Sequence, residues 1–302
     1  MEFSVTPISV THTEGLPIYQ FNIGSGNIDH KTVESFGEEW TKFDSFSEED
    51  LGASGDEYFD IINLSELRNA TVLEVGCGTG RWIKYLSGHA SRIVGIDPSD
   101  AVFTASKMLK DATNITICRA EVDAIPFDDN FFDFVYSLGV LHHIPDTKSA
   151  MKRCIEKLKP GGRFLVYLYY SLDNKSSLYR IIFQITNQVR LVVSKTRPGT
   201  KKFICDLLAV ILYMPVVLTA KFLKLIGLDA IAKHIPLSYY RNKSFNIIRN
   251  DSLDRFGTPL EQRFSKKEIQ TMMEDCGLTS IHFSASKPYW HAVGTKSISS
   301  TN

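Results

Sequence analysis

The stretch from Val72 to Gly80 constrains the fold of this chain more than any other. It opens with a short run typical of a buried strand, which leads into glycines at alternate positions, 76, 78 and 80. The segment from Arg81 to Leu86 then predicts the start of a helix. Such a strand, turn and helix need glycines because the backbone bends sharply and lets a ligand approach where a Cβ would collide. We therefore expect a ligand at this turn, facing helix-terminal N–H groups.

Two carboxylates indicate what that ligand carries. A second apolar run, Ile93 to Asp97, ends in an acid 17 positions after Gly80, which suits a carboxylate that binds ribose hydroxyls at the tip of the next strand. Glu74 lies inside the turn, where it would repel a pyrophosphate but could accept hydrogen bonds from an ammonium group. The spacing also differs from the Gly-x-Gly-x-x-Gly pattern of dinucleotide-binding folds. Together these features favour a nucleoside that carries an amino acid.

Four segments resemble motifs of the class I S-adenosylmethionine (SAM) dependent methyltransferases. Val72–Gly80 is similar to the first motif of that family, and Gly95–Ser99 to the second. Ala120–Phe127 and Phe132–Ser137 resemble the segment where the family contacts adenine and begins its fourth strand. The match covers roughly residues 70–168, with the motifs in the family's order. The resemblance implies an α/β fold with a Rossmann-like, seven-stranded, mostly parallel sheet, helices on both faces, and SAM as the cofactor, with S-adenosylhomocysteine as its product.

The resemblance also implies a set of cofactor-binding residues. Glu74 should lie near the methionine ammonium, and Asp97 should hold both ribose hydroxyls in a charge-assisted arrangement. Glu121, where the family usually has aspartate, should accept from the adenine amino group, while Phe127 either stacks near adenine or belongs to the core. The full expected set is Glu74, Gly76, Cys77, Gly78, Gly80, Asp97, Pro98, Glu121, Val122, Ser137 and Leu138.

Two histidines follow the predicted fourth strand. His142 and His143 lie in a Leu-His-His segment similar to one that family members often have. A neutral imidazole at this position could accept a substrate proton, so both are candidate catalytic residues, with a structural role as the alternative. Methyl transfer asks little of side chains, because the sulfonium is already activated and alignment of the two reactants supplies most of the acceleration.

Composition and missing motifs exclude several other classes. Lys plus Arg equals Asp plus Glu at 34 each, so no nucleic-acid partner is expected. Five widely spaced cysteines without a Cys-x-x-Cys pair predict neither a disulfide framework nor a metal site. The first ten residues lack the features of a signal peptide, which favours a cytoplasmic location. No Asn/Asp-Pro-Pro-Tyr or Pro-Cys sequence follows the fourth predicted strand, which disfavours methylation of bases or of glutamine amides.

We expect four parts along the chain. Residues 1–69 form an N-terminal segment with lid helices, 70–170 the SAM-binding core, 171–262 a helical insertion after strand five, and 263–302 a C-terminal helix with closing strands. The predicted strands cover 71–75, 92–97, 115–119, 132–137, 163–169, 279–284 and 289–295. The predicted helices begin at Arg81 or cover 32–50, 58–67, 99–110, 147–158 and 266–276, and residues 1–30 form a loop or short hairpin.

Residues 171–262 do not follow the alternation of strands and helices. Between residues 171 and 250, thirteen Lys or Arg face three acids, a formal charge of about +10. The run from Leu207 to Ala220 carries no charge, contains Pro215, and is flanked by lysines on both sides. It is shorter than the about 20 apolar residues of a bilayer span, so we expect a buried or interfacial helix.

The substrate cover is predicted from the segments before the first strand and after the fifth. The helix over 32–50 either packs on the edge of the domain or covers the pocket with Phe36 and Trp40. A basic and aromatic cover indicates an anionic or lipid-linked small molecule, whereas the alternative is an insertion with solvated lysines. The candidate substrate residues are Trp40, Tyr239, Tyr240, Arg241, Arg255 and Arg263.

The sequence thus predicts a SAM-dependent methyltransferase that acts on O, N or C of a small molecule. One alternative is a lipid or quinone methyltransferase, held peripherally on anionic headgroups by residues 195–224 rather than free in the cytoplasm. Another is a SAM-binding protein without methyl transfer. The acceptor and the oligomeric state stay open.

Overall fold

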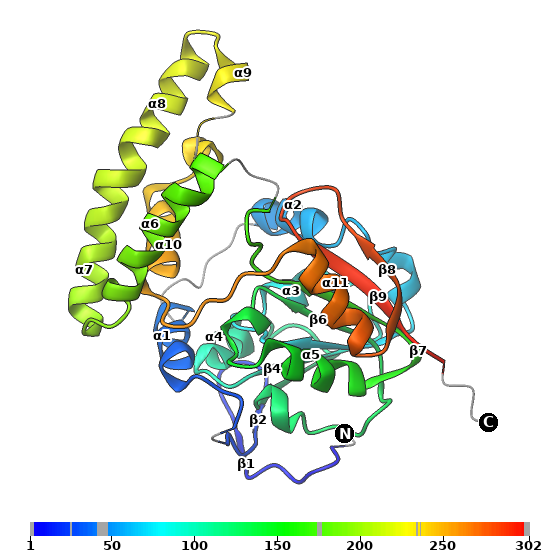
Figure 1. The fold of residues 1–302 in the computed structure, drawn as a ribbon. Coiled ribbons are helices and arrows are strands. Elements are labelled where there is room, and N and C mark those ends of the chain that lie inside the picture. The colour runs from blue at the N-terminus through cyan, green and yellow to red at the C-terminus, as the bar shows by residue number, and fades with distance from the viewer. Residues whose placement is uncertain are drawn as a thin grey trace. The chain divides into compact units, whose positions relative to one another are not determined.

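The computed structural model describes residues 3–24, 26–40, 48–173, 177–233, 235 and 237–298. The chain divides into two compact units (Figure 1). Unit 1 comprises residues 1–173 and 260–302, and unit 2 comprises residues 174–259.

Unit 1 is built on a nine-stranded sheet with the order β1-β2-β5-β4-β3-β6-β7-β9-β8. The strands from β2 to β7 pair in parallel, whereas β1, β9 and β8 pair antiparallel. This confirms the mostly parallel α/β sheet, with two strands more than expected, because the N-terminal hairpin joins it beside β5. The strands are β1 (Ser9–Thr11), β2 (Ile18–Gln20), β3 (Thr71–Val75), β4 (Arg92–Asp97), β5 (Ile115–Arg119), β6 (Phe132–Leu138), β7 (Leu158–Tyr167), β8 (Leu278–Phe283) and β9 (His291–Lys296).

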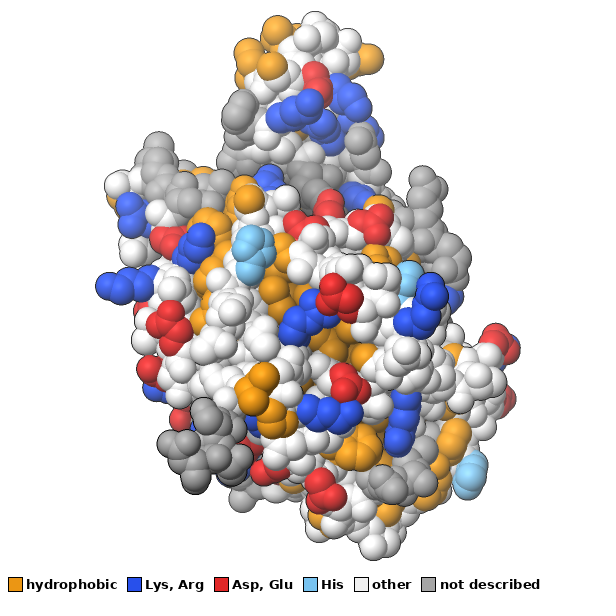
Figure 2. Space-filling model, turned by 90° about the vertical axis from the view of Figure 1, so that its right-hand side faces the viewer, with side chains coloured by type: hydrophobic (Ala, Val, Ile, Leu, Met, Phe, Trp, Pro, Cys, Tyr) orange, Lys and Arg blue, Asp and Glu red, His pale blue; other side chains and the backbone are white. Residues whose placement is uncertain are grey.

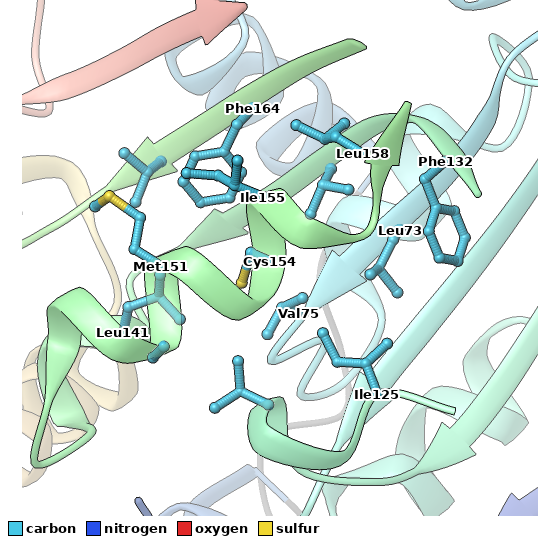
Figure 3. Packing of buried hydrophobic residues seen from close by; sticks show 14 of the residues in the cluster. Leu73, Val75, Ile125, Phe132, Leu141, Met151, Cys154, Ile155, Leu158 and Phe164 are labelled. Atoms are coloured by element: carbon cyan, nitrogen blue, oxygen red, sulfur yellow. The ribbon is translucent and has the colours of Figure 1, made fainter. Parts of the chain in front are cut away.

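Helices cover both faces of the sheet because its strands are apolar on both sides. Neighbouring residues of a strand point to opposite faces, so Val72 and Leu73 of β3 belong to different hydrophobic clusters. Leu73 packs in the cluster that includes Met151 and Phe164, shown in Figure 3. The helices of unit 1 are α1 (His30–Trp40), α2 (Glu48–Tyr58), α3 (Arg81–Leu86), α4 (Ala101–Met108), α5 (Thr147–Glu156) and α11 (Lys266–Asp275), with 3₁₀ turns η1 (Leu64–Leu67), η2 (Val122–Ala124) and η3 (Leu141–His143).

The N-terminal helices differ from the expectation. The prediction of a helix over 58–67 was wrong, because α2 ends at Tyr58 and a separate 3₁₀ turn starts at Leu64. The side chain of Asn63 accepts from the Ser65 N–H, and such a local bond starts a new short turn. The helix expected over 32–50 appears as α1, which ends at Trp40; residues 41–47 lie outside the described part.

Unit 2 is helical. Its core is a cluster that includes Val193, Cys205, Tyr213, Ile248 and Phe256. The hydroxyl of Ser252 donates to the carbonyl of Cys205 at 2.7 Å, which joins the helix Phe245–Gly257 to the helix Pro198–Leu208. The elements are α6 (Ser177–Val193), α7 (Pro198–Leu208), the π-helical η4 (Ala209–Tyr213), α8 (Met214–Leu225), α9 (Asp229–Ala232), the 3₁₀ η5 (Ser238–Asn242) and α10 (Phe245–Gly257).

The apolar run of unit 2 is part of a longer helix than the sequence suggested. Among the described residues, Gly199–Leu225 is one helix that is long and apolar enough, by length and composition, to cross a membrane. The uncharged run is thus only the middle of a longer helix, and the expectation that it is buried or interfacial stays a prediction. Pro215 lacks an N–H and would break an ordinary α-helix, but the wider π turn of Ala209–Tyr213 precedes it and the helix continues.

Replacing Leu73 with alanine tests the core of unit 1. Because Leu73 is fully buried, the cavity should lower the free energy of unfolding by about 2–5 kcal/mol. Urea titration followed by circular dichroism measures the change. Val5→Ala removes a mostly exposed side chain of the same unit and should change stability by less than about 0.5 kcal/mol. Equal shifts for the two variants would contradict this packing.

Candidate active site

The site lies where three parallel strands end. β4 and β6 flank β3 on opposite sides, so the chain leaves β3 in one direction and returns on the other. In such sheets a crevice forms at the carboxyl ends of the strands where the order reverses. Val75, Asp97 and Leu138 end these three strands, and the glycine turn follows Val75.

The glycine turn has no space for a side chain at Gly76 but has open space beside Gly78. The N–H groups of Gly76 and Cys77 donate to the Ile96 carbonyl at 2.8 and 2.9 Å. A Cβ on Gly76, which has φ +80°, would lie 2.4 Å from the Val140 side chain, so only glycine fits. A Cβ on Gly78 (φ +51°) would meet no atom within 4 Å. The turn therefore leaves free space for a ligand at Gly78.

Asp97 is tied to this turn. Its Oδ2 accepts from the Gly78 N–H at 2.9 Å, and its Oδ1 accepts from the Ser99 N–H and hydroxyl at 2.8 and 2.6 Å. Each carboxylate oxygen has about two acceptor positions, so a ligand hydroxyl fits best at Oδ2. Burial raises the pKa of Asp97, against the lowering effect of these donors.

Glu74 is a buried carboxyl at the base of the turn. The hydroxyl of Tyr136 donates to its Oε2 at 3.1 Å. Burial raises the pKa of Glu74 well above its ordinary value, and the positive charge of Arg81 offsets only part of that shift. A buried anion is costly unless it is paired, so an arriving ammonium group would compensate this carboxylate. The Glu74 carboxyl therefore fits the ammonium group in the amino-acid part of SAM.

The N-terminal segment contacts two acids that follow β5. Glu121, expected at adenine, accepts from the Gly24 N–H through Oε1 at 2.7 Å. Asp123 accepts from the Asn27 N–H through Oδ2 at 3.1 Å, and its buried Oδ1 has no hydrogen-bond partner in the described part of the chain. Sequence reasoning missed Asp123, although an acid just before Ile125 could have drawn attention to it. We add it as a candidate acceptor for the adenine amino group.

The other expected cofactor residues lie at or just after the carboxyl ends of the parallel strands. Burial raises the pKa of the Cys77 thiol, which stays protonated, and the carbonyl of Pro98 accepts from Arg119 at 3.2 Å. The hydroxyl of Ser137 donates its hydrogen to the Val75 carbonyl at 2.8 Å, so toward a ligand this oxygen could only accept. Gly80 precedes α3, Val122 begins η2, and the Leu138 side chain is buried.

His142 is fully buried beside the end of β7. Its ring lies 3.9 Å from that of Tyr169 and 4.0 Å from that of His143, measured between centroids. The Tyr169 N–H donates to its Nδ1 at 3.4 Å, so a neutral ring carries its hydrogen on Nε2. This buried Nε2 has no hydrogen-bond partner among the described residues. Burial lowers the pKa of His142 well below 6.5, and the neighbouring His143 and Arg263 lower it further.

His143 has the opposite tautomer. Its Nδ1 lies 2.7 Å from the carbonyl of Leu260, and a carbonyl can only accept, so Nδ1 carries the hydrogen. The lone pair of the neutral ring is then on Nε2. Phe36 packs 4.8 Å from this ring, measured between centroids. The two histidines thus offer one N–H donor and one basic nitrogen.

The predicted substrate residues fall into both units. In unit 1, Arg263 pairs with Glu261 at 2.7 Å and stands over the ring of Tyr169. In unit 2, Tyr240 and Arg255 both bind Asp251, and Arg241 pairs with Asp229 at 3.3 Å. Trp40 ends α1 and Tyr239 lies in η5, but their side chains are outside the described part. That these residues form one substrate site stays a prediction.

A family model described as a methyltransferase domain matches residues 73–166, which include the glycine turn, Asp97 and both histidines. Residues 73–166 are thus similar to a methyltransferase domain. SAM is the cofactor of this family, and the residues around Gly78 fit it.

Two proteins similar to this chain are methyltransferases named for quinones. The ubiquinone biosynthesis O-methyltransferase of Coxiella burnetii is 30% identical over 122 residues, 38% of this chain and 50% of that protein. The demethylmenaquinone methyltransferase of Staphylococcus saprophyticus is 36% identical over 94 residues, 30% of this chain and 40% of that protein. The chain thus spans half or less of these relatives. Among solved structures, the YcgJ protein of Bacillus subtilis is 18% identical with a TM-score of 0.46, over 75% of this chain and 69% of that one.

Replacing Glu74 with glutamine should change how stability depends on pH. The folded-state pKa of Glu74 lies above its unfolded value, so its stabilising contribution is present at low pH and lost as pH rises through the folded pKa. Relative to the wild type, Glu74→Gln should therefore gain up to about 1.4 kcal/mol per pH unit in that range, while its affinity for SAM falls.

Urea titrations between pH 5 and 8 and calorimetry with SAM measure the two effects. Glu57→Gln, on the exposed side of α2, is the matched control and should change neither. A pH dependence of Glu74→Gln that parallels the wild type would show that this carboxyl is not the buried group inferred here.

Proposed function

We propose that this protein transfers a methyl group from SAM to a small hydrophobic molecule with an acidic hydroxyl group. The observation that carries the proposal is that two carboxyls meet at the open turn at Gly78. Glu74 lies in the strand before the turn, and Asp97 accepts from the Gly78 N–H. Glu74 would bind the ammonium group of the cofactor, and Asp97 would bind a ribose hydroxyl through Oδ2. Once bound, SAM supplies an activated methyl group on a sulfonium.

The two histidines would handle the proton of the acceptor. The Nε2 of His143 would take the proton from the acceptor hydroxyl, as a general base. The buried Nε2–H of His142 would donate a hydrogen bond to an oxygen of the same molecule, where it currently has no partner in the described part of the chain. The N–H of His142 beside the basic nitrogen of His143 suits O-methylation, because one can bind the acceptor while the other removes its hydroxyl proton. The ring of Tyr169, stacked on His142, would face an aromatic acceptor such as a quinol.

A quinone-type or lipid-linked acceptor would place the enzyme at the cytoplasmic surface of a membrane. The relatives named for ubiquinone and demethylmenaquinone support this class of acceptor. The structural observation that supports it is the exposed apolar helix of unit 2, and residues 195–224 would make the peripheral contact. A role of residues 171–262 as a substrate lid belongs to the same proposal.

Calorimetry with SAM tests the cofactor site. The wild type should bind one equivalent, and Asp97→Ala should bind at least tenfold more weakly, since it removes the acceptor of both the turn and the ribose. Asp128→Ala, an exposed acid of the same unit, is the control and should bind as the wild type does. Binding that Asp97→Ala leaves unchanged would reject the proposed site.

Incubation of the enzyme with methyl-labelled SAM and a lipid extract, followed by mass spectrometry, identifies the acceptor. Label should appear in a quinol or another lipid-soluble phenol. If the protein binds SAM but forms no S-adenosylhomocysteine with any extract, it is a SAM-binding protein and the catalytic part of the proposal fails.

Variants of the two histidines should separate the base from the donor. His143→Asn keeps a donor for the Leu260 carbonyl but has no basic nitrogen, so kcat should fall by about 10²–10⁴-fold. His142→Gln keeps an N–H near the position of Nε2 and should retain more activity than His142→Leu. Initial rates with the identified acceptor give kcat and KM, and calorimetry confirms that SAM still binds. A His143→Asn enzyme with full kcat would contradict the role as base.

A further inference from the structure

Unit 2 carries most of the exposed apolar side chains of the molecule. Of the 22 large hydrophobic residues that are exposed in the described part of the chain, 18 belong to this unit. A monomer rarely leaves apolar patches larger than a few hundred Å² open to water, and larger ones mark a surface for another molecule. The exposed apolar residues of unit 2 therefore call for a partner.

The long helix of Gly199–Leu225 has two different sides. Cys205, Ala209, Tyr213 and Val217, four residues apart, are buried in the core of unit 2. A second series lies on the exposed side and includes Phe203, at 69% exposure, and Phe222, at 59%. This exposed face consists of Phe203, Leu207, Val210, Ile211, Leu218, Phe222 and Leu225, and we refer to it as the apolar face.

A second helix of the unit repeats the pattern. In α6, Ile181, Ile185, Val189 and Val192 are exposed and follow each other at helical spacing, although Arg190 of the same helix is buried. The turn after α8 adds Ile226 and other apolar residues to the exposed set. Burying these side chains in hydrocarbon would gain the transfer free energy that the folded unit leaves unused.

Positive charge borders the apolar face. Lys201 and Lys202 precede it and Lys221 and Lys224 lie in its last turns, while its only acid, Asp206, bonds to Arg249 at 2.8 Å. Unit 2 as a whole has fourteen Lys and Arg against four Asp, a formal charge of +10, and the rest of the chain carries −10. Figure 2 shows Lys and Arg side chains beside apolar ones at the end of the unit that carries α8 and α9. Phosphate headgroups are the complement of such a border.

The chain leaves unit 1 and returns to it at the same place. The N–H of Ser171 donates to the Phe264 carbonyl at 2.9 Å, and Tyr170 forms a bridge with Phe264. Both ends of unit 2 are therefore on one side of any membrane, which requires an even number of crossings. Among the described helices only Gly199–Leu225 is apolar enough to cross. This helix must then lie within one leaflet instead of spanning the bilayer.

We propose that unit 2 is a monotopic anchor that lays the apolar face in one leaflet of an anionic phospholipid membrane, with the bordering lysines at the phosphates. The inference deepens the membrane contact proposed above, and it does not rest on methyl transfer. A second copy of the chain is a less favourable partner, because two units of charge +10 would repel each other.

Flotation of the full chain with vesicles tests the anchor. Binding should be at least tenfold stronger to vesicles with 30% phosphatidylglycerol than to pure phosphatidylcholine, and it should weaken as NaCl rises from about 0.1 to 0.5 M. The triple variant Phe203→Ser, Leu218→Ser, Phe222→Ser should bind at least tenfold more weakly. The matched control, Val5→Ser, Ile8→Ser, Ile298→Ser, changes exposed apolar residues of unit 1 and should bind as the wild type does.

Tryptophans placed at Phe203, Ile211 and Phe222 distinguish a helix within one leaflet from a spanning one. Lipids brominated at a fixed depth should quench all three to a similar degree, after subtraction of the wild-type signal. Strong quenching of Ile211→Trp alone by deeply brominated lipid would indicate a span and overturn the proposal.

Two further measurements keep the outcomes separate. Circular dichroism and SAM calorimetry show whether the serine variant is folded, independently of lipid. If the wild type ignores anionic vesicles, the anchor is rejected even when SAM binds normally. If it also forms a dimer that the serine variant loses, the apolar face is an interface between copies of the chain.

Discussion

The fold of the site depends on the way the end of β3 is fastened to the end of β4. The Ile96 carbonyl accepts from the two N–H groups that open the glycine turn, and the next residue, Asp97, accepts from Gly78. Three hydrogen bonds between the end of β4 and the turn thus fix a loop that would otherwise have many conformations. The cost is that Gly76 and Gly78 must adopt positive φ, which glycine does most easily. With the loop fixed, the two carboxyls that flank it take defined places.

Burial shifts the pKa values of three titratable groups at the candidate site, each toward the neutral form of the group. Burial raises the pKa of Glu74 and Asp97 and lowers that of His142, so each of these groups is pushed toward its neutral form in the absence of a ligand. A ligand with an ammonium group and hydroxyls reverses this effect for the carboxyls, because it supplies the missing partners. These carboxyls would therefore suit the ammonium group and the hydroxyls of the proposed cofactor.

Local patterns in the sequence were sufficient to predict the sheet of the core. Alternation of apolar residues and glycine spacing each depend on neighbours in sequence, and the strands from β3 to β9 follow from them. The attachment of the N-terminal hairpin to β5, and the contacts of Gly24 and Asn27 with Glu121 and Asp123, join residues about 100 positions apart, and no local signal carries such pairings. The tautomers of the histidines likewise depend on Tyr169 and Leu260.

The long helix of unit 2 shows a different limit of local reasoning. The absence of charged residues defined only the middle of this helix. The helix continues through the lysines at both ends and past Pro215, because one of its sides packs on α6 and α10. Exposure of the other side is a property of the folded unit. Only the combination of a buried and an exposed side distinguishes a half-embedded helix from a core helix of the same composition.

The return from unit 2 to unit 1 has a consequence for protein engineering. Arg190 of α6 donates to the carbonyls of Thr258 and Pro259 at 2.8 and 3.1 Å, and the next carbonyl, that of Leu260, receives the Nδ1–H of His143. Within unit 1, the Leu260 N–H also donates to the Thr32 hydroxyl at 3.2 Å, so excising residues 174–259 and joining the cut ends should leave the Leu260 carbonyl near His143. A chain trimmed in this way would therefore keep the acceptor that sets the tautomer of His143.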